Sequence, residues 1–420
     1  MTTTKNNEHK KLNFSSEREQ SQACLNSAEH EKNQGRKVLN VPNLRFPEFQ
    51  GKWEYFLIND VCSEFKSGKN IKADSVFECG EYPVYGGNGL RGYTSSYNHE
   101  GSYVLIGRQG ALCGNVRSVY GKTYITEHAI AVAGNEKSNT SFLHYLFLKM
   151  NLGQYSDQSA QPGLAVNKLL KLKVALPIIS EQTKIAKLLS LLDERISTQS
   201  KIIDKLQSLI KGLEDNLLDN PLWEKTYLRS FMQFFSTNSL SWEQLSYKEG
   251  AIRNLHYGLI HGFQTRGINS ASLPMIKNEA IPKQYTLCQV GDVAFADASE
   301  DTGEIAKSVE FVDTIEGDTI CGLHTIHGRD IKNRTVVGFK GFAFNSRYFH
   351  NQIKRLAQGT KVFSITANDL SSCYVYLPDL ETQKAIVNLL KTYEAKLLVS
   401  KRLLEHYEKQ KQYLLRQMFI

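Results

Sequence analysis

The sequence predicts an α+β fold, in which two pseudo-symmetric mixed globular domains are separated by an antiparallel pair of long coiled-coil helices. The first observation is a duplicated segment, because "LPIISEQTKIAKLLSLL" (176–192) returns without a gap as "LPDLETQKAIVNLLKTY" (377–393), 201 positions later. The second is a heptad pattern that starts within each copy, and the third is a mixed texture of short strand-like, turn and helical segments before each copy. A repeat of this length is too long for a solenoid unit and indicates two copies of a whole module.

The duplication divides the chain into five predicted segments. Residues 1–40 are rich in Lys, Asn, Glu, Ser and Gln with isolated apolar residues, which predicts a disordered N-terminal arm. The remaining boundaries are a first globular domain at 41–179, a first long helix at 180–219, a second globular domain at 220–379 and a second long helix at 380–420.

Each globular part contains short elements of both kinds. Strands are expected at "SYVLIG" (102–107), within "KTYITEHAIAVAG" (122–134), at "DVAFA" (292–296) and at "NRTVVGF" (333–339), and helices at "SFLHYLFLKM" (141–150) and "SRYFHNQIKRLAQ" (346–358). The "WEQL" that starts at Trp242 is interpreted as the counterpart of the "WEYF" that starts at Trp53. The module thus recurs with diverged contents.

The two long helices carry the strongest periodic signal. Apolar residues follow one another at alternating steps of four and three, which is the seam of a coiled coil. Gln199 and Ser400 are polar exceptions near the helix midpoints and lie 201 positions apart, so antiparallel helices would bring them into one central layer that fixes the register. The predicted seam residues are Ile185, Leu189, Leu192, Ile196, Gln199, Ile203, Leu206, Ile386, Leu390, Tyr393, Leu397, Ser400, Leu404 and Tyr407.

Composition narrows the class of protein. A hydrophobic content of 41% and a charged content of 22% are ordinary for a globular protein of 420 residues, and the net charge of +8 favours a polyanionic partner. The seven cysteines are scattered without a C-x-x-C pair, which argues against a disulfide framework and against a zinc site. Since neither a membrane-spanning run nor a secretory signal is evident, the protein is expected in the cytoplasm.

These features together resemble the specificity subunit of a type I restriction-modification system over residues 41–420. The resemblance rests on "VPNLRFPEFQGKWEYFLINDV", "YPVYGGNGLRGY", "GRQGALCGNV", the "LPxxxxQ" start of each long helix and the duplicated order of domain and helix. It implies a non-catalytic, sequence-specific DNA-binding subunit whose two target recognition domains read a bipartite target with a fixed unread gap. Its helices would dock two methyltransferase (modification) subunits and restriction/translocase subunits. It implies no cofactor in this chain, whereas the partners would use S-adenosylmethionine, ATP and Mg.

Recognition of double-stranded DNA requires Lys or Arg for phosphates, amide or guanidinium groups for base edges, and glycines where the backbone approaches closely. The loops of both globular parts supply such residues. Arg108 and Gln109 in "GRQG" are suited to guanine and adenine edges. The complete set of candidate DNA contacts is Lys66, Lys69, Lys72, Tyr85, Asn88, Arg91, Tyr93, Arg108, Gln109, Arg253, His256, Tyr257, His261, Gln264, Arg266, Lys307, His324 and Arg329.

The residues predict neither a catalytic centre nor a metal site. "DNPLW" (219–223) resembles the N-P-P-aromatic corner of adenine methyltransferases but has Leu222 at its third position, and "PDLETQK" (378–384) is interpreted as a helix cap. His128 and His324 occupy loosely similar places in the two modules and are interpreted as buried structural histidines. The alternative function is a coiled-coil scaffold that joins two ligand-binding domains unrelated to DNA.

Overall fold

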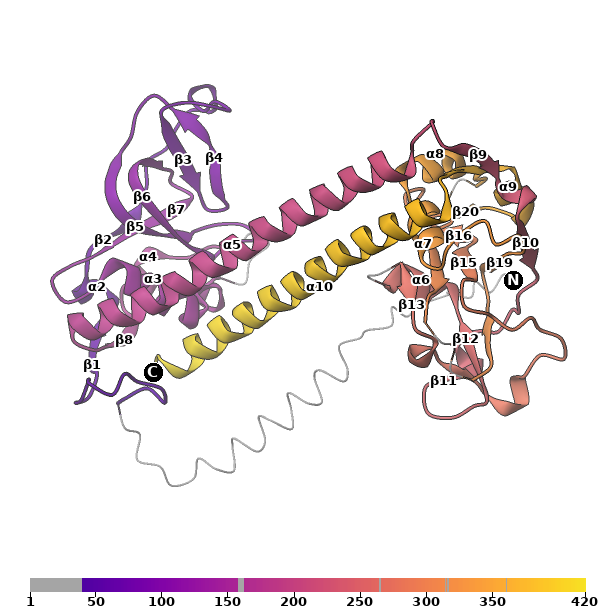
Figure 1. Cartoon of the computed structure of the whole chain (residues 1–420). Coiled ribbons are helices and arrows are strands. Elements are labelled where there is room, and N and C mark those ends of the chain that lie inside the picture. Colours follow the sequence, from indigo (N-terminus) through magenta and orange to yellow (C-terminus); the bar gives the residue numbers. More distant parts are fainter. Residues whose placement is uncertain (1–39, 158–161, 264–265, 314, 316, 360) are drawn as a thin grey trace, which may run out of the picture. The chain divides into compact units, whose positions relative to one another are not determined.

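The computed structural model describes residues 40–157, 162–263, 266–313, 315, 317–359 and 361–420 (Figure 1). The predicted disordered arm, apart from Asn40, lies outside the described residues. The chain divides into two compact units, one formed by the residues up to Asp193 together with Lys409–Ile420, and the other by Glu194–Glu408. Each unit therefore combines one globular module with parts of both long helices.

The first module is built on a six-stranded sheet of order β2-β7-β5-β6-β3-β4, beside a two-stranded sheet of β1 and β8. The strand β3 runs parallel to β6, and the other neighbours of the large sheet are antiparallel. The strands are β1 (Glu54–Leu57), β2 (Cys62–Ser67), β3 (Tyr82–Gly86), β4 (Gly89–Thr94), β5 (His99–Gly107), β6 (Val116–Ile125), β7 (Ala129–Gly134) and β8 (Lys173–Leu176), and the helices are α2 (Ile58–Val61), α3 (Thr140–Met150) and α4 (Val166–Leu169).

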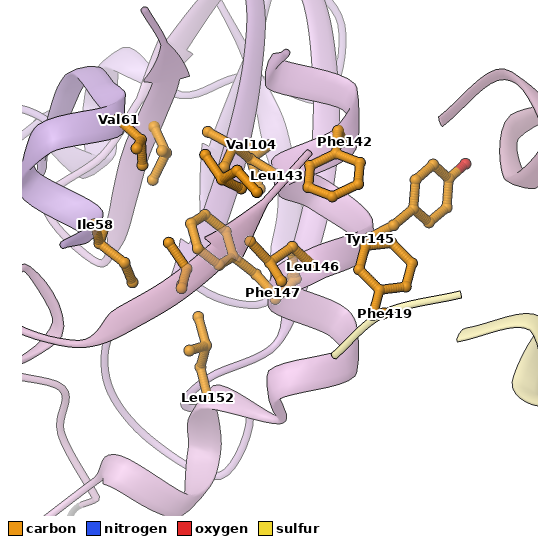
Figure 2. Close-up of a cluster of buried hydrophobic side chains, with 14 of the residues drawn as sticks. Ile58, Val61, Val104, Phe142, Leu143, Tyr145, Leu146, Phe147, Leu152 and Phe419 are labelled. Atoms are coloured by element: carbon orange, nitrogen blue, oxygen red, sulfur yellow. The ribbon is translucent and has the colours of Figure 1, made fainter. Parts of the chain in front are cut away.

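The helix α3 packs against the first sheet and supplies much of its core. Figure 2 shows Phe142, Leu146 and Phe147 of α3 among the buried side chains that include Val104 of β5. The ring of Phe142 stacks on Phe419, with centroids 5.1 Å apart, so the C-terminus of the chain closes this core. The predicted strand at 102–107 and the helix at 141–150 are confirmed.

The second module distributes its strands over several smaller sheets. The largest has the order β10-β19-β15-β17-β13, and a four-stranded sheet has the order β11-β14-β12-β18. Its strands are β9 (Glu224–Tyr227), β10 (Met232–Phe235), β11 (Leu245–Ser246), β12 (Ile252–Leu255), β13 (Gly267–Ile268), β14 (Met275–Ile276), β15 (Val293–Ala296), β16 (Ala298–Ser299), β17 (Ser308–Phe311), β18 (Thr319–Cys321), β19 (Thr325–Asp330), β20 (Phe363–Ser364) and β21 (Tyr374–Leu377), and its helices are α6 (Tyr257–Gly262), α7 (Phe339–Ala343), α8 (Arg347–Leu356) and α9 (Ala367–Ser372).

The two modules share a strand order despite these differences. The run β2-β7-β5-β6 corresponds to β10-β19-β15-β17, and each module has a two-stranded antiparallel sheet that leads into a long helix, β1-β8 in the first and β9-β21 in the second. Trp53 directly precedes β1 and Trp223 directly precedes β9. The predicted pairing of Trp53 with Trp242 is therefore wrong, because Trp242 begins a short 3-10 helix elsewhere in the module.

The long helices are α5 (Ile179–Leu218) and α10 (Leu380–Gln417), and within residues 194–408 they pack antiparallel. Gln199 Nε2 donates to the backbone oxygen of Ser400 at 3.2 Å, whereas Leu217 and Leu218 of α5 lie in one core cluster with Ile386 and Leu390 of α10. As α5 advances, its neighbours on α10 come from earlier in the chain. The predicted adjacency of Gln199 and Ser400 is thus confirmed.

A buried glutamine explains the repeated "LPxxxxQ". Gln182 Nε2 donates to the backbone oxygens of Pro177 at 2.8 Å and Lys137 at 2.9 Å, while its Oε1 accepts from Asn139 N at 2.8 Å. In the second module, Gln383 makes the same three contacts.

Gln383 donates to the backbone oxygens of Pro378 and Arg334, both at 3.0 Å, and accepts from Val336 N at 3.0 Å. Both glutamine side chains are fully buried. Each ties the first turn of a long helix to a loop of its own module, because a buried amide is costly unless its donors and acceptor are satisfied.

Two further predictions concern segments beside α10. The segment 333–339 is not a strand; it forms turns that lead into α7, and its Val336 N binds Gln383 instead of a neighbouring strand. The predicted cap at "PDLETQK" is confirmed, because the carboxylate of Asp379 accepts from Thr382 N at 2.9 Å at the start of α10.

Candidate nucleic-acid interface

Three of the predicted DNA contacts surround one hollow in the first module. The hollow has a volume of about 340 Å³, and the loops that follow β3 and β5, with the turn before β7, form its wall. Its lining residues are Gly86, Gly87, Asn88, Arg91, Gln109, Gly110 and His128. Asn88, Arg91 and Gln109 are exposed and present amide and guanidinium groups, which are the groups that read base edges.

Glycine is required where these loops meet. A Cβ added at Gly87 would lie 2.7 Å from the backbone oxygen of His128, closer than real Cβ atoms come. The backbone of Arg108 is fixed beside it, since its N donates to the same His128 O at 2.9 Å and its O accepts from Leu164 N at 2.9 Å. The loop after β5 is therefore held by backbone hydrogen bonds, which leaves its side chains available.

The other predicted residues of the first module lie outside this hollow. Lys66, Lys69 and Lys72 are exposed, and Lys66 Nζ forms an ion pair with Glu64 at 3.1 Å. Tyr85 is half-buried and packs on a small apolar cluster of the sheet, and Tyr93 is half-buried on β4. The lysines are available to phosphates, whereas the two tyrosines also support the sheet.

Sequence reasoning missed two cationic or titratable groups near the hollow. Arg117 on β6 places its guanidinium beside Gly89, where an added Cβ would lie 3.1 Å from Arg117 Nη2. His128 is half-exposed, with Nδ1 3.1 Å from Gln109 Oε1, so its interpretation as a buried structural residue is wrong. The sequence offered one signal for Arg117, its place in a strand of alternating residues. That Arg117 and His128 lie near the hollow depends on the pairing of strands, which the order of residues does not reveal.

The second module repeats the two backbone hydrogen bonds of Arg108 with other side chains, and we call this pair of hydrogen bonds the backbone frame. Asp297 follows β15 as Arg108 follows β5, and its N donates to His324 O at 3.1 Å while its O accepts from Ile365 N at 3.0 Å. His324 Nδ1 lies 3.0 Å from Asp297 Oδ1, and its side chain is 49% exposed. His128 and His324 are therefore equivalent in position, as predicted, but neither is buried.

Aromatic and titratable groups fill the space beside this frame in the second module. His256 is buried, accepts from Gly258 N at 3.2 Å and stacks on Trp242, with ring centroids 4.4 Å apart. Burial, with a contribution from the nearby His324, lowers the pKa of His256 to about 4, so it is neutral at physiological pH. Tyr257 packs edge-on against His324, with centroids 5.2 Å apart.

A small polar network follows at the end of α6. Glu304 binds Lys307 Nζ at 2.9 Å and His261 Nδ1 at 3.3 Å. Burial alone would raise the pKa of Glu304, but the hydrogen bonds from Lys307 and His261 hold it below its usual value. Lys307 and His261 are thus held together by one carboxylate.

The three predicted arginines of the second module all bind other groups of the protein. Arg253 donates to the backbone oxygen of Ala271 at 3.0 Å. Arg266 pairs with Glu214 of α5 at 2.9 Å and with Glu394 of α10 at 2.8 Å. The two ion pairs of Arg266 hold the module to both helices within the second unit.

Arg329 binds both carboxylate oxygens of Asp292, at 2.8 and 2.7 Å. The predicted contact Gln264 lies outside the described residues. Among the described helices, none is long and apolar enough to cross a membrane.

The chain is similar to known proteins in both sequence and fold. The chain matches the family described as "Type I restriction modification DNA specificity domain" over residues 50–208 and 322–408. It is 45% identical over 134 residues to the type I restriction enzyme EcoprrI specificity subunit of Escherichia coli, a match that covers 31% of this chain and 33% of that protein. It is 25% identical over 401 residues to the MjaVIII specificity subunit of Methanocaldococcus jannaschii, covering 88% of this chain and 91% of that protein.

The matched portion thus spans only about a third of the length of the Escherichia coli relative. The fold resembles the crystal structure of a type I restriction-modification S subunit from M. genitalium, with a TM-score of 0.62, 16% identity and coverage of 90% of this chain and 99% of that one. At this identity the likeness concerns the fold alone.

Proposed function

The chain belongs to the type I restriction modification DNA specificity domain family, and we propose that it is the non-catalytic specificity subunit of a type I restriction-modification complex in the cytoplasm. In this role it binds double-stranded DNA and reads a bipartite target with a fixed unread gap. The two target recognition domains are residues 41–179 and 220–379, and residues 180–219 and 380–420 are the spacer helices between them. The chain itself uses no cofactor, and S-adenosylmethionine, ATP and Mg are used by its partners.

The observation that carries this proposal is the shared backbone frame with unlike side chains. Arg108 and Asp297 occupy equivalent positions. Each is fixed by a hydrogen bond to the histidine before the neighbouring strand of its sheet, His128 before β7 or His324 before β19, and by one to the repeat-related residue Leu164 or Ile365. A frame that is conserved between modules while its outward side chains differ suits two readers of different half-sites. Asn88, Arg91 and Gln109 around one hollow supply the base-reading groups of the first domain.

The antiparallel helices support the idea of a fixed gap. Because half-site separation mirrors the separation of the reading domains, a stiff helix pair converts a length of protein into a number of unread base pairs. The seam residues support this arrangement, since Gln199 and Ser400 are adjacent and Ile203, Ile386 and Leu390 are buried.

Exposed apolar residues on the two helices support the docking of modification subunits. Ile202 and Leu209 of α5 are 41% and 44% exposed, and Val399 and Leu403 of α10 are 63% and 37% exposed. Ile202 and Leu209 are seven residues apart, about two helical turns, so they lie on one face. Ile202 and Leu403 are related by the 201-residue repeat, which suits two copies of one methyltransferase subunit. Restriction/translocase subunits would join the complex through these modification subunits.

The decisive experiment maps adenine methylation across a genome that expresses this chain with its modification subunit. A bipartite motif with one gap length is expected. The double substitution Arg108→Ala with Gln109→Ala should abolish or relax the specified bases of one half-site only, at a cost of about 1–3 kcal/mol for each lost contact. The matched control Lys171→Ala changes an exposed cation away from the hollow and should leave the motif unchanged.

Two outcomes would overturn the proposal. A continuous motif without a gap would remove the bipartite reading. DNA affinity that does not fall steeply with rising salt would favour the alternative, a scaffold joining two ligand-binding domains unrelated to DNA, because phosphate contacts impose a strong salt dependence.

The spacer idea has a separate test. Seven residues inserted into both α5 and α10 lengthen the pair by about 10 Å, which is close to three base pairs of duplex. The methylated motif should then gain about three unread base pairs, whereas an insertion in α5 alone should disrupt the pairing of the helices. Retention of the original gap after the double insertion would show that the helices do not set it.

A further inference from the structure

A buried group of two thiols and one imidazole lies in the second module. Cys288 precedes β15, Cys321 ends β18 and His327 lies within β19, so three separate segments converge. Their relative exposures are 6%, 3% and 1%. One ligand atom from each, the two Sγ atoms and an imidazole nitrogen, all lie within 4.8 Å of one another.

The separation of the thiols suits a shared metal ion. Cys288 Sγ and Cys321 Sγ are 3.6 Å apart. Two thiolates on tetrahedral zinc, each about 2.3 Å from the ion, are about 3.8 Å apart. Both segments are fixed by the backbone, because Cys288 N donates to Thr319 O at 2.8 Å and Leu287 forms an isolated bridge with Ile320. The two thiols are therefore held at a ligand-like separation by strand pairing.

A carboxylate orients the imidazole. His327 Nε2 lies 2.7 Å from Asp292 Oδ2, which leaves Nδ1 as the remaining ring nitrogen. Asp292 in turn accepts from Arg329 Nε at 2.8 Å and from Gln289 N at 2.8 Å. A metal-binding histidine commonly has its second nitrogen bound to such a carboxylate.

A further buried polar atom lies on the same strand. The hydroxyl of Thr319 is fully buried and has no hydrogen-bond partner among the described residues. Side chains two apart on a strand share a face, so Thr319 lies on the same face of β18 as Cys321. An orphaned hydroxyl there could bind a water molecule that completes a fourth coordination position.

We propose that Cys288, Cys321 and His327 bind one zinc ion that fastens the β12–β18 sheet to β15 and β19 of the second module. Both thiols bind as thiolates, so two protons leave to solvent as the ion binds. The two thiolates balance the charge of the ion, which makes the site tolerable in an apolar surrounding. The scattered spacing of the cysteines, which argued against a zinc site in the sequence, does not exclude it, because the strands bring distant residues together.

The test measures metal in the full-length chain, purified without an affinity tag that binds metal and without chelator. One zinc per chain is expected by elemental mass spectrometry. Cys288→Ser and Cys321→Ser should each lose the zinc, whereas Cys373→Ser should keep it, because Cys373 is a buried cysteine of the same module outside the group.

A second measurement on the unsubstituted chain guards against variants that fail to fold. Cobalt added to the apoprotein should give a sulfur-to-cobalt charge-transfer band that zinc abolishes, and zinc should raise the melting temperature of the apoprotein. The thiols of Cys288 and Cys321 should become reactive to an alkylating reagent only after chelation, with the exposed Cys79 as an internal standard that reacts throughout. Failure to retain zinc together with the lack of a thiolate–cobalt band would overturn the proposal, as would a disulfide between Cys288 and Cys321 in the freshly purified chain.

Discussion

The residue after β5 in the first module is Arg108, and the residue after β15 in the second is Asp297, yet both hold the same two backbone hydrogen bonds. Next to Arg108 the loops leave a hollow whose lining includes Gln109 and three glycines, whereas beside Asp297 the rings of Tyr257 and His324 pack edge to face. The two regions keep the same backbone hydrogen bonds while the side chains beside them differ. Backbone hydrogen bonds fix the position of the loop, so its side chains can be replaced without loss of the fold.

The contacts between each module and its long helix, in contrast, use the same side chain in both modules. Gln182 and Gln383 repeat three hydrogen bonds each with nearly equal distances, and both are buried. The residue directly before each glutamine has different contacts. Glu181 is buried and pairs with Arg45 at 2.7 Å, whereas Thr382 is half-buried and its hydroxyl donates to Asp379 at 2.7 Å. The anchor of each helix is thus preserved while the residues beside it diverge.

The largest expected effect comes from removing either anchor. Gln182→Ala or Gln383→Ala removes three hydrogen bonds and leaves the buried backbone oxygen of Pro177 or Pro378 without this partner, which costs about 1–3 kcal/mol. Thermal unfolding of the full chain should show a lower melting temperature for both variants. The control Gln412→Ala, an exposed position on α10, should change it little. If Gln182→Ala and Gln383→Ala lower the melting temperature by different amounts, the two glutamines share their geometry but contribute differently to stability.

The next largest effect is expected at Arg108 and Asp297, the equivalent positions whose side chains differ between the modules. Arg108→Asp places the residue of the second module in the first and should weaken binding of the target duplex by about 2 kcal/mol, roughly 30-fold, through a lost base contact and repulsion of phosphates. Asp297→Asn should weaken binding less or strengthen it, because it removes a negative charge. The measurement is fluorescence anisotropy of the chain assembled with its modification subunit, at one stated salt concentration. Equal losses for both variants would contradict the different roles of the two positions.

A smaller, pH-dependent effect comes from the carboxylates that share Arg266. Burial raises the pKa of Glu214 to about 7, with Arg266 opposing the shift and Glu394 adding to it. Because the folded pKa lies above the unfolded one, the contribution of Glu214 to stability is present below pH 4.5 and is lost as the pH rises through 7. Glu214→Gln should therefore stabilise the chain by about 1–2 kcal/mol at pH 8 and by less at pH 5. Melting temperatures across this range check it, with the exposed Asp204→Asn as control; an effect independent of pH would contradict it.

The smallest effect comes from His256, which is buried beside Trp242 in the second module. Its folded pKa of about 4, set by burial, lies below the unfolded value of 6.5, so its contribution to stability is present above pH 6.5 and is lost as the pH falls towards 4. His256→Asn keeps a residue that can cap α6 and should reduce the acid-induced loss of stability between pH 7 and pH 5 by about 1 kcal/mol. The exposed His406→Asn on α10 is the control, and an unchanged pH profile for His256→Asn would show that folding does not lower the pKa of the imidazole.

Periodic patterns were enough to predict the long helices. The heptad seam that includes Ile185 and Ile386 and the 201-residue repeat predicted two helices with Gln199 opposite Ser400, because helical spacing depends only on local order. The strand at 102–107 was likewise readable from β-branched and apolar residues.

Predictions failed where a residue depends on a partner distant in the chain. The segment 333–339 has strand-like composition, but Gln383 takes the hydrogen bond of Val336 N and a turn forms instead. Trp242 was mistaken for the counterpart of Trp53, because the true counterpart, Trp223, lies beside a helix end where the spacing between modules changes.

The order of residues along the chain is enough to predict two copies of one module, each followed by a long amphipathic helix, because repetition and heptad spacing are patterns in that order. The folded chain is needed to see that Arg108 and Asp297 are equivalent, that Asn88, Arg91 and Gln109 surround one hollow, and that Cys288, Cys321 and His327 meet. These relations arise from pairing between strands far apart in the sequence, and such pairing depends on the packing of the whole module and not on the residues next to each position.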